Sequence, residues 1–177
     1  NGNANLTGIS DLFGEYANYI YGLPKNNNPI LQSYQKELTE KITVMDLQET
    51  IDNIEEKSGT VPNMIMCSWK TRRILQALFA ENHIVLDNVV LDGGYKAISY
   101  NGIPIVVDKY CPDGEIYFLN TDCFKLCQLC DWEWLADDDG RILKQVPNKA
   151  TYTATLVKYA ELICEKPCAQ GRLTGVV

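Results

Sequence analysis

Residues 43–59 carry the clearest helical pattern in the chain. The apolar positions of this stretch fall on one face at helical spacing: Leu47, Ile51 and Ile54. Thr43 and Asp46 stand in the T-x-x-D order of a capping box, which satisfies backbone donors at a helix start. Gly59 supplies the left-handed residue that commonly ends a helix. The pattern therefore predicts a helix that begins after Thr43 and ends at Gly59.

Two further stretches have helical spacing. Residues 69–82 follow Ser68, a suitable cap, and are predicted to form a helix. This helix is expected to pack through Ile74, Ala77 and Leu78. Residues 10–23 predict a shorter amphipathic helix with a weak point at Gly14. Its apolar positions are Leu12, Phe13, Tyr16, Tyr19, Ile20 and Leu23. The polar stretch 24–29, bounded by two prolines, is predicted to be a loop.

Strand signals dominate the second half of the chain. Asn101-Gly102 supplies the positive φ angles of a two-residue turn and predicts a hairpin over residues 95–110. Other segments are predicted as strands for their short apolar runs or alternation: residues 63–67, 115–119 and 151–164. The run DDDGR at 137–141 predicts a tight turn. Helices come early and strands late, so the class is α+β, and the order of strand then helix is typical of a mixed β-sheet flanked by helices.

Residues 124–134 alternate with a period of two, which favours a strand. One face holds apolar side chains with only Gln128 polar: Phe124, Leu126, Cys130, Trp132 and Trp134. The other face holds Lys125, Asp131 and Glu133. We therefore expect a strand with one apolar face.

Composition narrows the possible functions. A chain of 177 residues is about one domain long and can bury a core without disulfides. The net charge of −7 disfavours binding to nucleic-acid phosphates, because such proteins normally present a basic face. Neither a membrane-spanning run nor a signal peptide is visible, so a cytosolic product is expected. Seven cysteines are an odd number, and most are expected to be reduced.

Cys123, Cys127 and Cys130 have the spacing C-x-x-x-C-x-x-C, which radical enzymes use to hold an iron-sulfur cluster. On a strand, Cys130 points away from the other two, and Cys123 and Cys127 lie about 13 Å apart along the chain. A helix would instead bring the three sulfurs onto one stripe. The question is therefore whether this segment is a strand or a helix, and the alternation favours the strand.

Other chemical sites have weaker support. Zinc bound by Cys127 and Cys130 needs further ligands, for which the candidates are Cys111, Cys164, Cys168 and His83. His83 is the only histidine, and no serine motif for nucleophilic hydrolysis accompanies it. No glycine-rich phosphate loop is present, and the acidic run at 137–139 lacks the distal glutamate of a calcium loop. Neither an enzyme activity nor a cofactor is predicted.

An ordered series of short motifs carries a family resemblance. It comprises Tyr100, Gly102, Pro104, Ile105 and Asp108, then Ile116, Tyr117, Leu119 and Asn120, then Trp134 with Asp139-Gly140, and finally Pro167, Ala169 and Gly171. This series resembles the C-terminal part of the major capsid proteins of tailed phages and prophages, which have the Hong Kong ninety-seven coat fold. The resemblance covers most of residues 60–177 well and the first 40 residues weakly.

The resemblance implies a structural protein that binds copies of itself in rings and shells. It implies a truncated or processed subunit, because the family's N-terminal arm, extended hairpin and spine helix do not precede this region, and Asn1 replaces the initiating Met. Residues 1–123 and 166–177 are then like the axial domain, and 124–165 are strands toward the peripheral domain. Such a chain is expected to remain a monomer or a small ring.

The same resemblance suggests contacts and location. Candidate self-association residues lie in the loop that begins at residue 81 and on the late strands: Asn82, His83, Asp87, Asn88, Asp92, Trp132 and Trp134. The product would be a virion capsid subunit assembled in the cytoplasm of a bacterial host, a homo-oligomer without a membrane, small-molecule or specific nucleic-acid partner. Two alternatives stay open: an encapsulin-type compartment shell, and a metal or iron-sulfur module on Cys123, Cys127 and Cys130.

Overall fold

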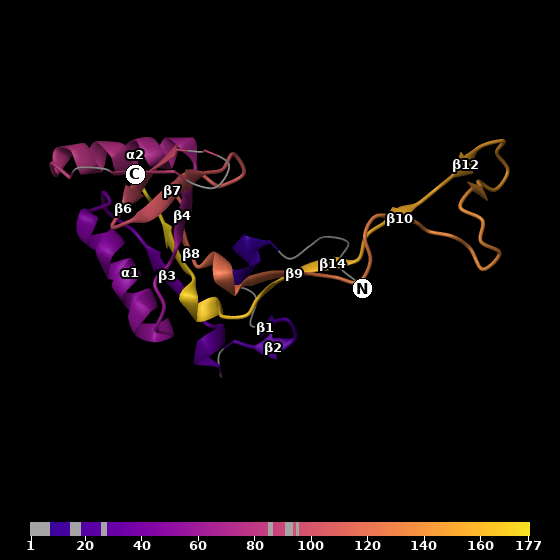
Figure 1. Ribbon diagram of the computed structural model, residues 1–177, viewed down its shortest axis with the longest axis horizontal. Coiled ribbons are helices and arrows are strands. Elements are labelled where there is room, and N and C mark those ends of the chain that lie inside the picture. The colour runs from indigo at the N-terminus through magenta and orange to yellow at the C-terminus, as the bar shows by residue number, and fades with distance from the viewer. Residues whose placement is uncertain (1–7, 15–18, 26–27, 85–86, 91–93, 95) are drawn as a thin grey trace. The chain divides into compact units, whose positions relative to one another are not determined.

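The computed structural model, shown in Figure 1, describes residues 8–14, 19–25, 28–84, 87–90, 94 and 96–177. The chain divides into two compact units, which we name and describe separately. The core unit comprises Ile9–Phe124 and Cys164–Val177. The ribbon unit comprises Lys125–Ile163 together with Asn1–Gly8, of which only Gly8 is among the described residues.

A mixed seven-stranded sheet organises the core unit, as the sequence predicts. Its strand order is β3-β15-β8-β4-β7-β6-β5. The strands are β3 (Tyr34–Glu37), β4 (Met64–Cys67), β5 (Asp87–Val90), β6 (Lys96–Tyr100), β7 (Ile103–Val107), β8 (Ile116–Leu119) and β15 (Gly171–Thr174). The pairs β15 with β3 and β4 with β7 are parallel, and the other four are antiparallel. Two predicted strands, β4 and β8, and the predicted hairpin of β6 and β7 with its turn at Asn101-Gly102 are thereby confirmed.

The helix α1 (Val44–Ser58) has the boundaries that its caps predict. The backbone N–H of Asp46 donates to the Thr43 hydroxyl, and the Asp46 carboxylate accepts from the Thr43 backbone N–H. Gly59 ends the helix with a φ of +68°. Local signals at both ends therefore set the length of α1.

The helix α2 (Trp69–Glu81) begins after the predicted cap, since the Ser68 hydroxyl accepts from the backbone N–H of Thr71. Of the three predicted packing residues, Leu78 is buried and Ile74 packs against the core, but Ala77 does not. Ala77 is exposed and Ile74 is only partly buried, while Leu75 and Phe79 are fully buried. The helix is therefore rotated relative to the expected orientation, because the large Phe79 side chain packs inward on the Tyr100 ring.

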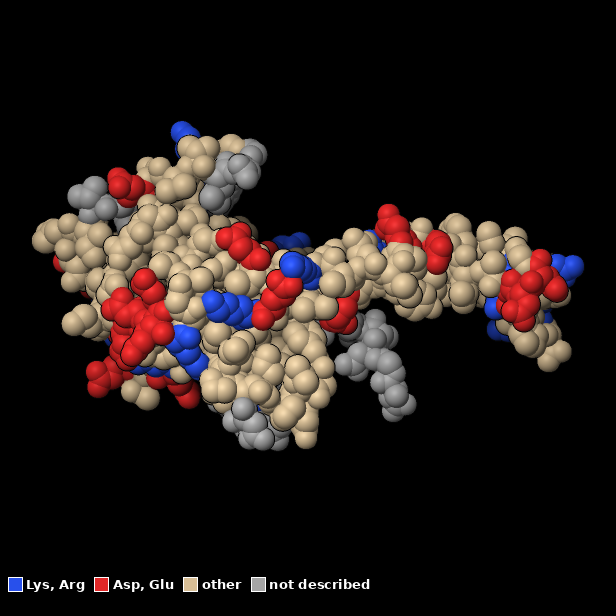
Figure 2. Space-filling model, turned by 60° about the horizontal axis from the view of Figure 1, so that its bottom comes forward, with Lys and Arg blue, Asp and Glu red and all other residues tan. Residues whose placement is uncertain are grey.

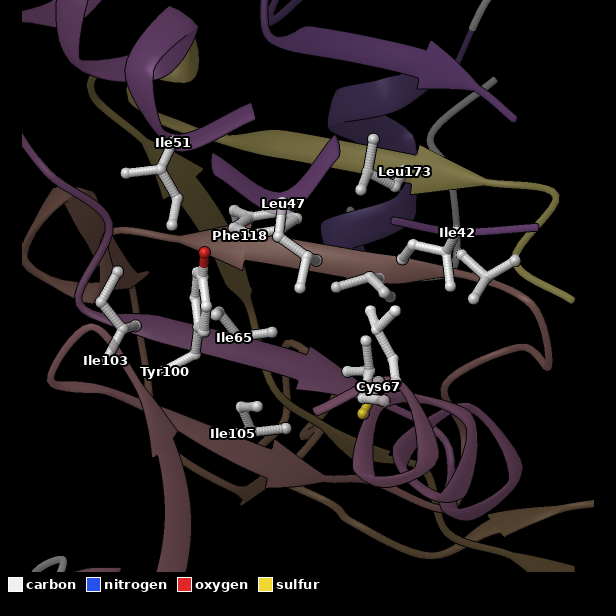
Figure 3. Close-up of a cluster of buried hydrophobic side chains, with 14 of the residues drawn as sticks. Ile42, Leu47, Ile51, Ile65, Cys67, Tyr100, Ile103, Ile105, Phe118 and Leu173 are labelled. Atoms are coloured by element: carbon white, nitrogen blue, oxygen red, sulfur yellow. The ribbon is translucent and has the colours of Figure 1, made fainter. Parts of the chain in front are cut away.

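Both helices contribute to one hydrophobic core on the same side of the sheet, as Figure 3 shows for part of the cluster. Side chains alternate across a strand, so Ile65 and Cys67 of β4 face this core. Met64 and Met66 face the opposite side, where they pack in a second cluster with Tyr117 and Leu119 of β8. The sheet thus separates a helix-covered face from a helix-free face.

The helix-free face is covered by the segment that the sequence predicts as an amphipathic helix, and that prediction is wrong. The segment forms the 3-10 helix η1 (Ile9–Phe13) and, after residues 15–18, which lie outside the described part, the short hairpin β1 (Tyr19–Ile20) and β2 (Leu23–Pro24). Tyr21 and Gly22 both adopt positive φ, which turns the chain between the strands. Leu12 and Phe13 are buried in the second cluster.

The ribbon unit consists of short antiparallel strand pairs, and parts of its first pair extend into the core unit. The pairs are β9 (Phe124–Gln128) with β14 (Ala160–Cys164), β10 (Glu133–Trp134) with β13 (Leu156–Val157), and β11 (Lys144–Gln145) with β12 (Tyr152–Thr153). The predicted long strands over 124–134 and 151–164 are therefore interrupted. The turn at 137–141 is confirmed, since Gly140 N–H donates to Asp137 C=O.

The core unit also contains three short 3-10 helices: η2 (Pro29–Leu31), η4 (Thr121–Cys123) and η5 (Pro167–Ala169).

Candidate functional site

The described part of the ribbon unit has no hydrophobic core. None of its side chains from Lys125 to Ile163 is buried, although the segment is rich in large apolar residues. The exposed ones are Leu126, Leu129, Trp132, Trp134, Leu135, Ile142, Leu143, Tyr152, Leu156 and Tyr159. The apolar face predicted at 124–134 is therefore largely exposed, with only Phe124 and Cys130 half-buried. Contiguous exposed apolar surface of this kind commonly marks a protein–protein contact.

We name three neighbouring side chains of the ribbon the aromatic face: Trp132, Trp134 and Leu156. Trp134 lies directly opposite Leu156 in the β10–β13 pair. Lys158 follows Leu156 by two residues, and its Nζ lies 5.8 Å from the centre of the Trp132 ring. This contact places Trp132 next to the β10–β13 pair. The three apolar side chains are 64%, 53% and 46% exposed, respectively.

Charge is distributed unequally between the units. The ribbon unit has five Lys or Arg against six Asp or Glu, a net charge of −1, which leaves −6 for the rest of the chain. Lys158 Nζ also pairs with an Asp131 carboxylate oxygen at 3.0 Å, and this hydrogen bond lowers the pKa of Asp131. Figure 2 shows acidic side chains gathered on the surface of the core unit. The ribbon is therefore nearly neutral, while the core units of two copies would repel each other.

The other predicted self-association residues lie in the core unit. Asn82 and His83 follow the end of α2 and are exposed. Asp87 and Asn88 lie on β5, so the segment that was expected to be a loop contains the outer strand of the sheet. Asp92 lies outside the described residues. Trp132 and Trp134 are both exposed on the ribbon unit. The contact role of all seven residues stays a prediction.

The cysteine motif resolves in favour of a strand. Cys127 lies within β9 and is exposed, Cys130 follows the strand and is half-buried, and Cys123 ends η4. Cys127 is thus not a packing residue. The further zinc candidates divide into buried Cys111, Cys164 and Cys168 and exposed His83. Among the residues that the structure describes, no three His, Cys, Asp or Glu side chains are placed to hold a metal ion.

Three buried thiols make the stability of the fold sensitive to alkaline pH. Burial raises the pKa of Cys67 to about 12 and that of Cys111 and Cys164 to about 11, against an ordinary value of 9.0. Above pH 9 the unfolded chain releases these protons while the folded chain retains them. The free energy of unfolding is therefore expected to fall by at most ~1.4 kcal/mol per pH unit for each thiol as the pH rises through this range.

Urea unfolding under reducing conditions from pH 8 to about 10.5 measures this slope. Cys164→Ala removes one of the titrating groups and should make the slope shallower, whatever its effect on stability at neutral pH. Identical slopes for the wild-type chain and Cys164→Ala would contradict the assignment.

A pocket of about 340 Å³ opens on the helix-free face of the core unit, beside η1. Met66 and Tyr117, which are paired across β4 and β8, form its floor. Its remaining lining comes from η1 and the loop after β7: Ile9, Ser10, Asp108, Tyr110, Cys111 and Pro112. Sequence reasoning missed this pocket, because its walls come from four separate segments and no motif marks them.

The pocket has an acidic character. Besides burial, the nearby carboxylates of Glu115, Asp108 and Asp113 raise the pKa of the Cys111 thiol, so all three act at this wall. Glu115 accepts from the Tyr117 hydroxyl and lies 4.0 Å from Arg172, and Asp113 accepts from Ser68, so both are engaged within the fold.

By sequence, neither a known protein family nor a curated protein matches this chain. By structure, it is similar to the holo-SrpI encapsulin complex of Synechococcus elongatus, with a TM-score of 0.60 and 13% identity over 80% of this chain and 52% of the other. It is also similar to the capsid of cyanophage A-1(L), with a TM-score of 0.58 and 16% identity over 88% of this chain and 54% of the other. The chain spans about half the length of each.

These similarities confirm the expected α+β coat fold, which is shared by phage capsid and encapsulin subunits. No helix among the described residues is long and apolar enough to cross a membrane.

Proposed function

We propose that this chain is a subunit of a closed protein shell and that it acts by binding copies of itself. The observation that carries this proposal is the ribbon unit, whose ten large apolar side chains are exposed while none of its residues is buried. Leaving so much apolar surface in water is unfavourable, and a partner that covers it recovers about 25 cal/mol per Å². The coat fold supports a second copy as that partner, because symmetric assembly multiplies one modest contact into many. The role is structural rather than enzymatic.

Within this class we favour the capsid of a phage or prophage, assembled in the cytoplasm of a bacterial host. The net charge of −7 supports it, since an acidic shell encloses DNA without adhering to it. The encapsulin-type compartment is the second candidate, supported by a similarity to an encapsulin as strong as that to the capsid. The core unit then corresponds to the axial domain and the ribbon unit to part of the peripheral domain.

Concentration-dependent association of the 177-residue chain tests the proposal. We expect reversible oligomers or small rings in sedimentation velocity at up to about 0.5 mM, a range that detects even millimolar-strength contacts. Trp132→Ala combined with Trp134→Ala should weaken association about 100-fold, because buried tryptophans are frequent hot spots of interfaces.

Leu143→Ala combined with Tyr152→Ala is the matched control, since it removes two equally exposed side chains elsewhere on the ribbon. A monomer is expected at low concentration, but a wild-type chain that is still monomeric at about 0.5 mM would contradict the proposal. Shell particles purified from cells separate the two candidates: bound DNA supports the capsid, and an enclosed protein cargo supports the compartment.

A further inference from the structure

We infer that the aromatic face of one copy docks on the pocket beside η1 of a second copy, with Trp132 as the inserted side chain. This inference rests on the proposed self-association and specifies its two surfaces. It joins the ribbon unit of one molecule to the core unit of another, so the two contacting surfaces are different.

Size and apolar character match between the two surfaces. The pocket volume of about 340 Å³ lies within the range of about 300–1,000 Å³ that holds small ligands, so one indole fits. Its walls include Met66, Pro112 and Tyr117, which offer sulfur, aliphatic and aromatic contacts. Trp132 is the most exposed tryptophan in the described part of the chain.

Hydrogen bonding and charge also match. A buried tryptophan requires an acceptor for its indole N–H. Asp108 lines the pocket and supplies a carboxylate; one of its oxygens accepts from the backbone N–H of Tyr110 at 2.7 Å, which leaves the other available. Lys158 lies over the Trp132 ring and would arrive with it at the acidic wall. Lys109 Nζ lies 4.6 Å from the centre of the exposed Tyr110 ring at the pocket rim. Its positive charge reduces the attraction between Lys158 and the acidic wall.

The charge division between the units favours this arrangement over one between like surfaces. Two core units, which together hold most of the net charge, would repel each other, whereas the ribbon is almost neutral. A contact between unlike surfaces also leaves one free pocket and one free aromatic face after each step. Such a contact propagates into rings or lattices, whereas a contact between two aromatic faces stops at a dimer.

Two lesions in separate chains test the inference by complementation. The knob variant carries Trp132→Ala and Trp134→Ala and keeps the pocket. The pocket variant carries Ser10→Phe, which places a ring at the exposed rim position of η1 and keeps the aromatic face. Each variant alone should stay monomeric, and their mixture should form a one-to-one heterodimer that grows no further. A chain that carries both lesions is the control. Its affinity for the knob variant and for the pocket variant should be at least about 100-fold weaker than the affinity between wild-type chains.

Asp108→Asn is a second pocket variant in case Ser10→Phe perturbs folding. It retains an acceptor for Tyr110 and removes the charge, so association should weaken about threefold to tenfold and become less sensitive to salt. Circular dichroism of every variant confirms folding before association is measured.

The possible outcomes separate the inference from the proposed function. If the wild type associates and the pocket variant alone still dimerises while the mixture gains nothing, the aromatic faces bind each other and the inference is wrong. If the wild type associates and neither lesion weakens it, other surfaces form the contact and the inference is also wrong. A monomeric wild type overturns the proposed function itself.

Discussion

Gly175→Ala is expected to lower the free energy of unfolding by about 2–5 kcal/mol. Gly175 follows β15 with a φ of +76°, a conformation that costs an alanine ~1–2 kcal/mol. A Cβ at this position would also lie 2.3 Å from the backbone carbonyl oxygen of Leu38, just beyond β3. Because a carbonyl cannot rotate away as a side chain does, the ends of the two parallel strands would have to separate, at a cost of about 1–3 kcal/mol.

Gly59→Ala is the matched control for this prediction. Gly59 has a similar φ of +68°, and nothing lies within 4 Å of its added Cβ. It therefore carries the conformational cost alone, ~1–2 kcal/mol. Chemical denaturation of both variants measures the difference, which reports the collision with Leu38. Equal losses for the two glycines would show that β15 and β3 can separate without cost.

Gln170→Leu is expected to destabilise the fold by about 2–4 kcal/mol, the cost of leaving two buried backbone groups without partners. Gln170 has no exposed surface, and its side-chain oxygen accepts from the backbone N–H of Asn120 at 2.8 Å. Its side-chain nitrogen donates to the Asn120 carbonyl at 3.3 Å and to the Lys166 carbonyl at 3.4 Å. One amide thus fixes the end of β8 to the turn before β15.

Two variants bracket this result in urea unfolding. Gln76→Leu makes the same chemical change on the exposed side of α2 and should change stability by less than about 0.5 kcal/mol. Gln170→Glu keeps the shape but, when ionised, cannot donate, so it should lose stability at neutral pH and regain part of it in mild acid. If Gln170→Leu matched Gln76→Leu, the hydrogen bonds to Asn120 would have no net value.

Local signals explain which parts of the fold were predictable from sequence. The capping box at Thr43 and Asp46 and the turn at Asn101-Gly102 involve residues close in sequence, so their geometry follows from the chain itself. The error at residues 10–23 arises because Tyr21 adopts a positive φ of 50°, which a tyrosine rarely does and no sequence pattern indicates. Tertiary packing, not propensity, decides that segment.

The candidate surfaces were predictable only in part. The alternation around Trp132 and Trp134 predicts that the two indoles share an apolar face, and both are exposed. Alternation alone does not say whether such a face is covered within the subunit or left for a partner, because periodicity is the same in both cases. The pocket depends on η1 packing beside the loop after β7, a contact between segments about a hundred residues apart in the sequence, which no single-sequence pattern reveals.

The parallel pairing of β3 with β15 also has a consequence for synthesis on the ribosome. Gln35 of β3 and Arg172 of β15 are register partners separated by 137 positions in the chain. At about 5–20 residues per second, β3 waits roughly 7–27 s for its neighbour to be translated. Its sequence, Tyr-Gln-Lys-Glu, suits this delay, because a polar and charged strand edge resists pairing with other nascent chains. The strand that waits longest is thus protected against premature aggregation.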